Sequence, residues 1–436
     1  MPASPSTARA INDRLALRLL QQEGPLTAGR LKQLTGLSRP TVADLVERLT
    51  AAGLIAVVGE AGEQRRGPNA KVYGIVADRA HLAALDVRTE SVALAVADLV
   101  GRVLAEASVP IGTDAGTGPA VEQAVALVER VVKEAGADRL HTVGIGAPGL
   151  IDPDGGELRD SSGLPEWHRR LVAALQERLP EAGVSVENET NLAALAEQRD
   201  GAARDRDTFV LLWLGHGTGA AVVLDGALRR GASGGTGEIG FLPVPGTAVL
   251  PSATDCEGGF HSLASSAAVV ELATECGLPV GRRGAASAGE EPTVVRAAAA
   301  AVRSAVQLVG EVGAGPAARF LDTLAGRIAV GAASVVAILD PGCVVLGGEV
   351  GRAGGEELAR RVQERLARMT PLPTEVRPTT LGGGAVLRGA LLTARDLAQE
   401  ELFTAGGVRR ERPDGGQGPS SPPPGRSAER TRPKGQ

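Results

Sequence analysis

The chain has 436 residues, more than one compact core usually holds, so we expect two or three domains. Hydrophobic residues make up 43% of it and aromatic residues 2%, which excludes a disordered chain and predicts cores packed mainly from Ala, Val and Leu. Its three cysteines show no Cys-x-x-Cys spacing, which argues against a disulfide framework and against a cysteine-rich zinc site.

Hydropathy argues against export and membrane insertion. The first ten residues contain no apolar segment of the kind that signal peptides have. The most apolar stretch, Ile328–Leu339, is shorter than a bilayer span and ends at Asp340 and Pro341. We therefore expect a cytoplasmic protein with no membrane partner.

The net charge of -5 conceals an uneven distribution. Residues 1–75 carry 10 Lys and Arg against 6 Asp and Glu, residues 403–436 carry 7 against 3, and the middle is acidic. Because phosphate repels an acidic surface, any contact with nucleic acid is expected from the two ends.

Residues 1–76 have the pattern of a winged helix-turn-helix domain. Apolar residues from Ile11 to Leu20 indicate a first helix, and Thr27 is a suitable cap for a second. After a turn at Gly36, Ser38 can cap a third helix, whose apolar side is formed by Val42, Leu45, Val46 and Leu49. The start and the opposite side of this third helix are expected to contact double-stranded operator DNA through Ser38, Arg39, Pro40, Thr41, Asp44 and Arg48.

Two short strands, residues 54–58 and 71–75, predict a hairpin wing after the third helix. Arg65 and Arg66 lie at its tip, where they could reach phosphates or the minor groove. The alternatives are ordinary surface arginines, or a small helical domain that binds protein. RNA recognition is less favoured, because this segment offers only Tyr73 for stacking on bases.

Residues 81–402 alternate strands and helices and contain a weak internal repeat. Residues 81–109 and 208–231 each predict three short strands with tight turns, and amphipathic helices follow them. We expect a duplicated α/β fold of two lobes. Residues 403–436 are rich in Pro, Gly and Arg, which predicts a disordered basic tail, either a solvated extension or an aid to DNA affinity.

Glycine-rich and polar motifs recur through these lobes in a fixed order. They are GIGAPGLID from Gly144, VENETN from Val186, LGHGTG from Leu214, GGTGEIG from Gly234 and LDPGCVVLGGEV from Leu339. Glycines let the backbone approach a phosphate or sugar closely, and Asn and Glu side chains can bind hydroxyl groups. With these motifs the chain resembles the ROK family of bacterial sugar-operon repressors and sugar kinases. The resemblance implies a duplicated, actin-like kinase fold, and the winged helix-turn-helix is typical of the repressor branch.

Departures from the family pattern argue against catalysis. Kinases of the family carry an Asp-x-Gly-Gly-Thr phosphate loop, whereas Asp86 is followed here by Val, Arg88, Thr and Glu90. The resemblance places the catalytic aspartate at Glu189, whose extra methylene shifts a general base by about an ångström. The family zinc site is also reduced, with Phe241 in place of a histidine and Cys256 as the only remaining cysteine. We therefore expect no metal, no cofactor and no kinase activity.

The resemblance nevertheless implies a ligand pocket. Its expected residues are Pro148, Gly149, Asn188, Glu189, Glu238 and His261. For His261 a purely structural role is an open alternative. The sequence predicts a repressor that is a homodimer or a dimer of dimers and that responds to a sugar or sugar derivative. An active sugar kinase that also binds DNA, and a DNA-binding scaffold with a vestigial pocket, remain alternatives.

Overall fold

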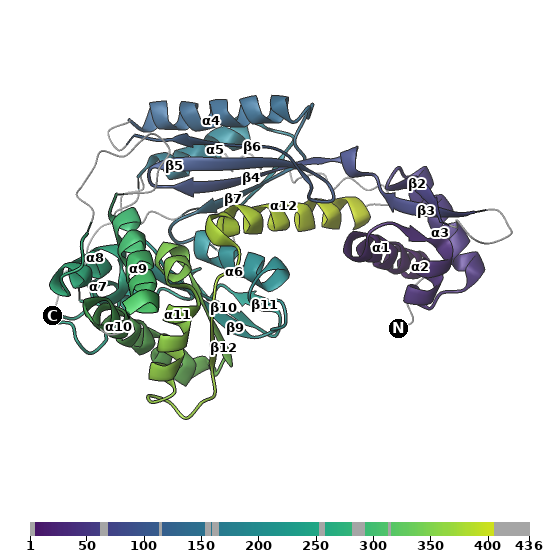
Figure 1. Cartoon of the computed structure of the whole chain (residues 1–436). Helices are drawn as coiled ribbons and strands as arrows, with labels where there is room; N and C mark the ends of the chain where they lie inside the picture. The colour runs from purple at the N-terminus through teal and green to yellow at the C-terminus, as the bar shows by residue number, and fades with distance from the viewer. Residues whose placement is uncertain are drawn as a thin grey trace, which may run out of the picture.

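The computed structural model describes residues 5–61, 69–112, 116–152, 158, 165–252, 258–280, 293–312 and 315–404. It shows an N-terminal domain of helices and a hairpin, joined to two α/β lobes (Figure 1). Arg65, Arg66, Cys256 and the predicted tail from residue 405 lie outside the described residues.

The N-terminal domain has the predicted order of three helices and a wing. Its elements are α1 (Pro5–Glu23), β1 (Leu26–Thr27), α2 (Ala28–Thr35), α3 (Arg39–Ala51), β2 (Ile55–Ala61) and β3 (Ala70–Ile75). The hydroxyl of Thr27 accepts a hydrogen bond from the backbone of Arg30, and that of Ser38 accepts one from Thr41, so both predicted caps are confirmed. Gly36 ends α2 with a positive φ of 69°.

The predicted apolar side of α3 is confirmed, because its four apolar residues are buried. The predicted first helix is confirmed as α1, although only some of its apolar residues are buried. Ile11 and Leu15 are exposed, whereas Ala16, Leu17 and Leu20 are buried. The reason is that α2, α3 and α12 cover only one side of α1, and the spacing of its leucines spreads them over more than that side.

The two lobes each contain a five-stranded sheet of the same topology, which confirms the predicted duplication. The first has the order β6-β5-β4-β7-β8 and the second the order β11-β10-β9-β12-β13. In each sheet the first three strands of the lobe are antiparallel neighbours and the last two are added in parallel. The strands of the first sheet are β4 (His81–Arg88), β5 (Ser91–Asp98), β6 (Val103–Pro110), β7 (Thr142–Ala147) and β8 (Gly183–Asn188). Those of the second are β9 (Phe209–Leu214), β10 (Thr218–Leu224), β11 (Ala227–Arg229), β12 (Cys343–Gly347) and β13 (Glu375–Pro378).

Helices cover these sheets, and one of them reaches the N-terminal domain. They are α4 (Thr117–Glu134), α5 (Trp167–Arg178), α6 (Glu189–Asp200), α7 (His261–Ala264), α8 (Ser266–Glu275), α9 (Thr293–Val312), α10 (Pro316–Leu339), α11 (Gly348–Leu366) and α12 (Ala385–Thr404). Short 3-10 turns are η1 (Ala77–Arg79), η2 (Ile239–Phe241) and η3 (Gly382–Gly384). Helix α12 packs on α6 and on the first sheet, and its C-terminal end contacts α1 (Figure 1). This helix therefore connects the lobes to the N-terminal domain.

The apolar stretch Ile328–Leu339 is the second half of α10. The stretch was expected to be too short to span a bilayer, but the helix that contains it is longer. With 24 residues, α10 is long and apolar enough to cross a membrane by length and composition alone. Half of its most apolar window is buried, however, and Phe320, Leu324 and Ile328 belong to the core of the second lobe. A buried core helix passes the same test of length and composition.

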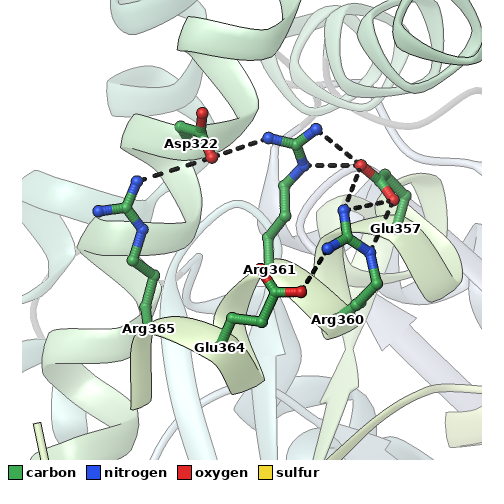
Figure 2. Close-up of polar contacts among 6 residues, drawn as sticks. All are labelled: Asp322, Glu357, Arg360, Arg361, Glu364 and Arg365. Carbon is green, nitrogen blue, oxygen red and sulfur yellow. Dashed lines mark hydrogen bonds and ion pairs between the residues drawn. The ribbon is translucent and has the colours of Figure 1, made fainter. Parts of the chain in front are cut away.

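Ion pairs join α10 to α11 (Figure 2). The guanidinium group of Arg361 lies between Asp322 of α10, at 2.8 Å, and Glu357 of its own helix, at 2.7 Å. Arg365 approaches Asp322 at 3.6 Å, and Arg360 binds Glu357 through three hydrogen bonds. This network fixes the part of α11 that follows a kink at Gly355, whereas Glu349 lies in the first turn, before the kink.

Candidate functional site: a cleft between the lobes

Loops from both lobes meet at the ends of the sheets, where Arg88 contacts Glu349 and Arg230 contacts Glu187. The region bounded by these loops is called the cleft. Gly149, which follows β7, accepts a hydrogen bond from the side chain of Asn188 at the end of β8. Gly234 and Gly237 have positive φ angles, and a Cβ on either would lie 1.9 Å from a backbone oxygen, that of Ile151 or Ala220. Only glycine permits so close an approach. The GGTG motif of the second lobe therefore packs directly against the loop of the first lobe that contains Ile151.

Asn188 is the cap of α6. Its Oδ1 accepts hydrogen bonds from the backbone of Thr190 at 2.9 Å and Asn191 at 3.3 Å, and its Nδ2 donates to Gly149 at 3.1 Å. The neighbouring Glu187 is buried and pairs with Arg230 at 2.6 Å. The amide of Asn188 therefore positions the loops and keeps a single N–H for a ligand.

Glu189 is an acid of the cleft whose pKa is strongly raised. Burial raises the pKa of its carboxyl to about 8, and the charges of Glu238 and Asp86 act in the same direction. Its Oε2 is buried and has no hydrogen-bond partner. Near neutral pH this carboxyl is therefore largely protonated, and it can donate a hydrogen bond to a hydroxyl group. Partial desolvation also raises the pKa of Glu238.

His261 lies across the cleft on α7, against the glycine-rich turn between β9 and β10. A Cβ on Gly217 would lie 3.3 Å from its Cε1. Burial, and then the charge of His216, lower the pKa of His261, so its ring is neutral near pH 7. The hydroxyl of nearby Thr218 is buried and lacks a partner. These groups can offer hydrogen bonds to a polar, uncharged molecule.

Arg88 bridges the two lobes at the position where the resemblance predicts a phosphate loop. It forms an ion pair of 3.0 Å with buried Asp86 of the same strand. Its Nη1 lies 3.4 Å from Oε1 of Glu349, and its Nη2 donates to the carbonyl of Gly383 at 3.4 Å. The roles of Glu349 and Gly383 were missed by sequence reasoning. Both lie in glycine-rich segments near the end of the chain to which no role was assigned.

His168 is a second residue that sequence reasoning missed. It is 1% exposed, and neither ring nitrogen has a hydrogen-bond partner. Its ring packs edge-on against Trp167 with centroids 4.3 Å apart. Burial lowers the pKa of His168 to about 4, although the nearby backbone of Arg88 opposes the shift. The imidazole of His168 is therefore neutral near pH 7 and buried beside the backbone of Arg88.

The predicted DNA-contacting residues at and within α3 differ in their exposure and in their ion pairs. Ser38, Arg39 and Pro40 are exposed at the start of the helix. Arg48, in contrast, forms an ion pair with Asp13 of α1 at 2.6 Å and another with Asp44. These carboxylates raise the pKa of its guanidinium group. Arg39 is therefore the freer cation, whereas Arg48 also joins α1 to α3.

The described part of the chain contains no group of three His, Cys, Asp or Glu side chains that could hold a metal ion. Phe241 is 40% exposed at the rim of the cleft loops, in the position where the resemblance predicts a zinc-binding histidine.

Comparisons with known proteins agree with this architecture. The sequence model of the ROK family matches residues 82–397, and that of the MarR family matches residues 11–67. The "DNA-binding transcriptional dual regulator NagC" of Escherichia coli is 27% identical over 244 residues, which cover 54% of this chain and 58% of that protein. The chain thus matches little more than half the length of this relative.

Solved structures extend the similarity to as much as 91% of the chain. The structure described as a "ROK family transcriptional regulator, homolog of E.coli MLC protein" superposes with a TM-score of 0.69 at 20% identity, over 91% of this chain and 97% of that one. A ROK hexokinase from Thermus thermophilus has a TM-score of 0.56 at 29% identity, over 73% of this chain and 99% of its own. The first comparison covers more of this chain than the second, so it supports the fold over 91% of the chain.

Proposed function

The chain belongs to the ROK family, and we propose that it is a cytoplasmic, DNA-binding transcriptional repressor whose kinase-like domain senses a sugar or sugar derivative. The observation that carries this proposal is the fusion of a winged helix-turn-helix with exposed Arg39 to a cleft whose buried polar atoms lack partners. Similar proteins are named a transcriptional dual regulator and a xylose repressor.

In this proposal a homodimer reads two half-sites with its α3 helices, and Ser38, Arg39 and Thr41 approach the DNA first. Arg65 and Arg66 of the wing would add contacts to phosphates or the minor groove. A sugar in the cleft would contact Glu189, Glu238 and His261. The protonated carboxyl of Glu189 suits a neutral hydroxyl better than an anionic group.

In this proposal, helix α12 transmits a movement of the cleft to the N-terminal domain, which binds the DNA. Immediately before it, Gly383 accepts the hydrogen bond from Arg88. Near its other end, Gln399 donates to Gln21 of α1 at 2.8 Å, and Glu400 pairs with Arg14. A helix of 20 residues is about 30 Å long, so a movement of the cleft end can be carried rigidly to α1.

Gel-shift titrations with the promoter beside the protein's own gene, with and without a panel of sugars, test the proposal. We expect sequence-specific binding that one sugar weakens, and we expect Glu238→Ala to bind DNA normally but to lose the sugar response. Binding without sequence preference at physiological salt would contradict the proposal.

A second candidate function is ATP-dependent sugar phosphorylation, which the retained Asp86 and the similarity to the Thermus hexokinase favour. Against it, the guanidinium group of Arg88 lies beside Asp86, and Glu189 is largely protonated at neutral pH and therefore a poor general base. Phosphorylation of a sugar that Glu189→Gln abolishes would establish this alternative. If no sugar raises the melting temperature, a scaffold with a vestigial pocket is favoured instead.

A further inference from the structure

A polar cavity lies where the N-terminal domain meets the lobes, and none of the cleft residues lines it. Its volume is about 450 Å³, and its walls come from α1, α6 and α12. Cavities of this size accommodate small molecules. The charged side chains that line it are Arg14, Arg18, Arg199, Arg395, Asp396 and Glu400.

The acidic groups of this junction cavity are already engaged by arginines. Glu400 pairs with Arg14, and Asp396 lies 3.1 Å from Arg199 and 3.0 Å from Arg395. Since four guanidinium groups line a cavity with two carboxylates, two positive charges are left uncompensated.

Two of the arginines differ in a way that favours a ligand. Arg18 is exposed, and among the described residues it has no ion-pair or hydrogen-bond partner. Arg395 is only 14% exposed and packs against Gly101, so its guanidinium group is held in place. One fixed cation and one free cation on facing walls can bind the two ends of a small anion at little cost in conformational entropy.

We propose that the junction cavity binds a small anion with at least two negative charges, either a phosphate ester or a polycarboxylate. The planar fork of arginine binds both groups through paired hydrogen bonds. A neutral sugar carries no charge for this site, which separates it chemically from the cleft. The proposal does not depend on the function proposed for the cleft.

A ligand in this position would affect the placement of the N-terminal domain. Arg14 and Arg18 belong to α1, whereas Arg395 belongs to α12, so a bound anion connects the two helices. It would favour the arrangement in which α1 lies against α12 over any arrangement in which they separate.

Isothermal titration calorimetry on the full-length protein, with pyrophosphate and citrate as probes at constant ionic strength, tests the proposal. We expect at least one probe to bind, and Arg18→Gln to weaken that binding at least tenfold. Arg9→Gln, which alters an exposed arginine of the same helix outside the cavity, is the matched control and should bind normally. The probe that binds distinguishes phosphate from carboxylate chemistry.

Three outcomes would overturn the proposal: no binding of either anion, unchanged binding in Arg18→Gln, or an equal loss of binding in Arg9→Gln. Circular dichroism of each variant shows that it is folded. Because the assay contains no DNA and no sugar, its result is independent of whether the protein represses transcription.

Discussion

Arg88 of the first lobe and Glu349 of the second lie 3.4 Å apart, Nη1 to Oε1, across the cleft. Arg88 also neutralises Asp86, whose side chain is 4% exposed and whose pKa burial raises. The same guanidinium group thus compensates a buried acid and connects strand β4 to the start of α11.

Replacement of Arg88 by alanine should lower the free energy of unfolding by about 2 kcal/mol, because it leaves Asp86 buried without its cation. The matched control is Arg130→Ala, which removes an exposed pair with Glu134 on α4 and should cost less than about 0.5 kcal/mol. Urea denaturation at pH 7 measures both. Equal losses in the two variants would mean that the Arg88 bridge adds nothing beyond a surface pair.

Glu189→Gln should stabilise the protein increasingly as pH rises. The pKa of Glu189 is about 8 in the folded protein and about 4.5 when unfolded, so the unfolded chain loses this proton first. The folded state is therefore penalised progressively between these values, and the glutamine variant escapes the penalty. We expect its advantage to grow by roughly 1–3 kcal/mol from pH 5 to pH 8.

Thermal melts at both pH values measure this change, with the exposed Glu177→Gln as control. A constant difference between Glu189→Gln and the unmodified protein would show that Glu189 is ionised in the folded state.

His168→Phe should protect the protein against acid. The pKa of His168 is about 4 in the folded state and about 6.5 when unfolded, so the unfolded chain gains a proton as pH falls through 6.5 while the folded protein does not. Stability is therefore lost between pH 6.5 and pH 4. Phenylalanine keeps an aromatic ring against Trp167 and removes this loss, so we expect a gain on the order of 1–2 kcal/mol at pH 5 relative to pH 7.5. Urea denaturation at the two pH values measures this gain. If His168→Phe changed the free energy of unfolding equally at both pH values, the assignment of a neutral, buried imidazole would be contradicted.

The network between α10 and α11 should depend on Arg361 far more than on Arg360 (Figure 2). The side chain of Arg361 is 12% exposed and joins the two helices, whereas that of Arg360 is 52% exposed and pairs only within α11. We expect Arg361→Ala to cost about 2 kcal/mol and Arg360→Ala less than about 0.5 kcal/mol in chemical denaturation. A larger loss in the Arg360 variant would show that the exposed pairs dominate.

Local patterns predicted much of the fold. The caps at Thr27 and Ser38, the buried side of α3 and the two strand meanders follow from hydrogen bonding and periodicity between near neighbours, which a sequence displays directly. The contacts that form the cleft were harder to predict from the sequence. The bridge from Arg88 to Glu349 joins residues 261 positions apart, and the engagement of Arg48 by Asp13 depends on how α1 crosses α3. No spacing rule relates such residues, because tertiary packing alone brings them together. The junction cavity was missed for the same reason.

The central claim, that this protein reads DNA through the start of α3, is tested most directly by selecting bound sequences from random duplex DNA with the full-length protein and with Arg39→Ala. We expect a palindromic motif, and we expect Arg39→Ala to weaken binding by about 1–3 kcal/mol or to relax one position of each half-site. A control variant, Arg178→Ala on α5, should select the same motif with unchanged affinity. No enriched motif, or a motif that Arg39→Ala reads as well as the unmodified protein, would show that the start of α3 does not read DNA.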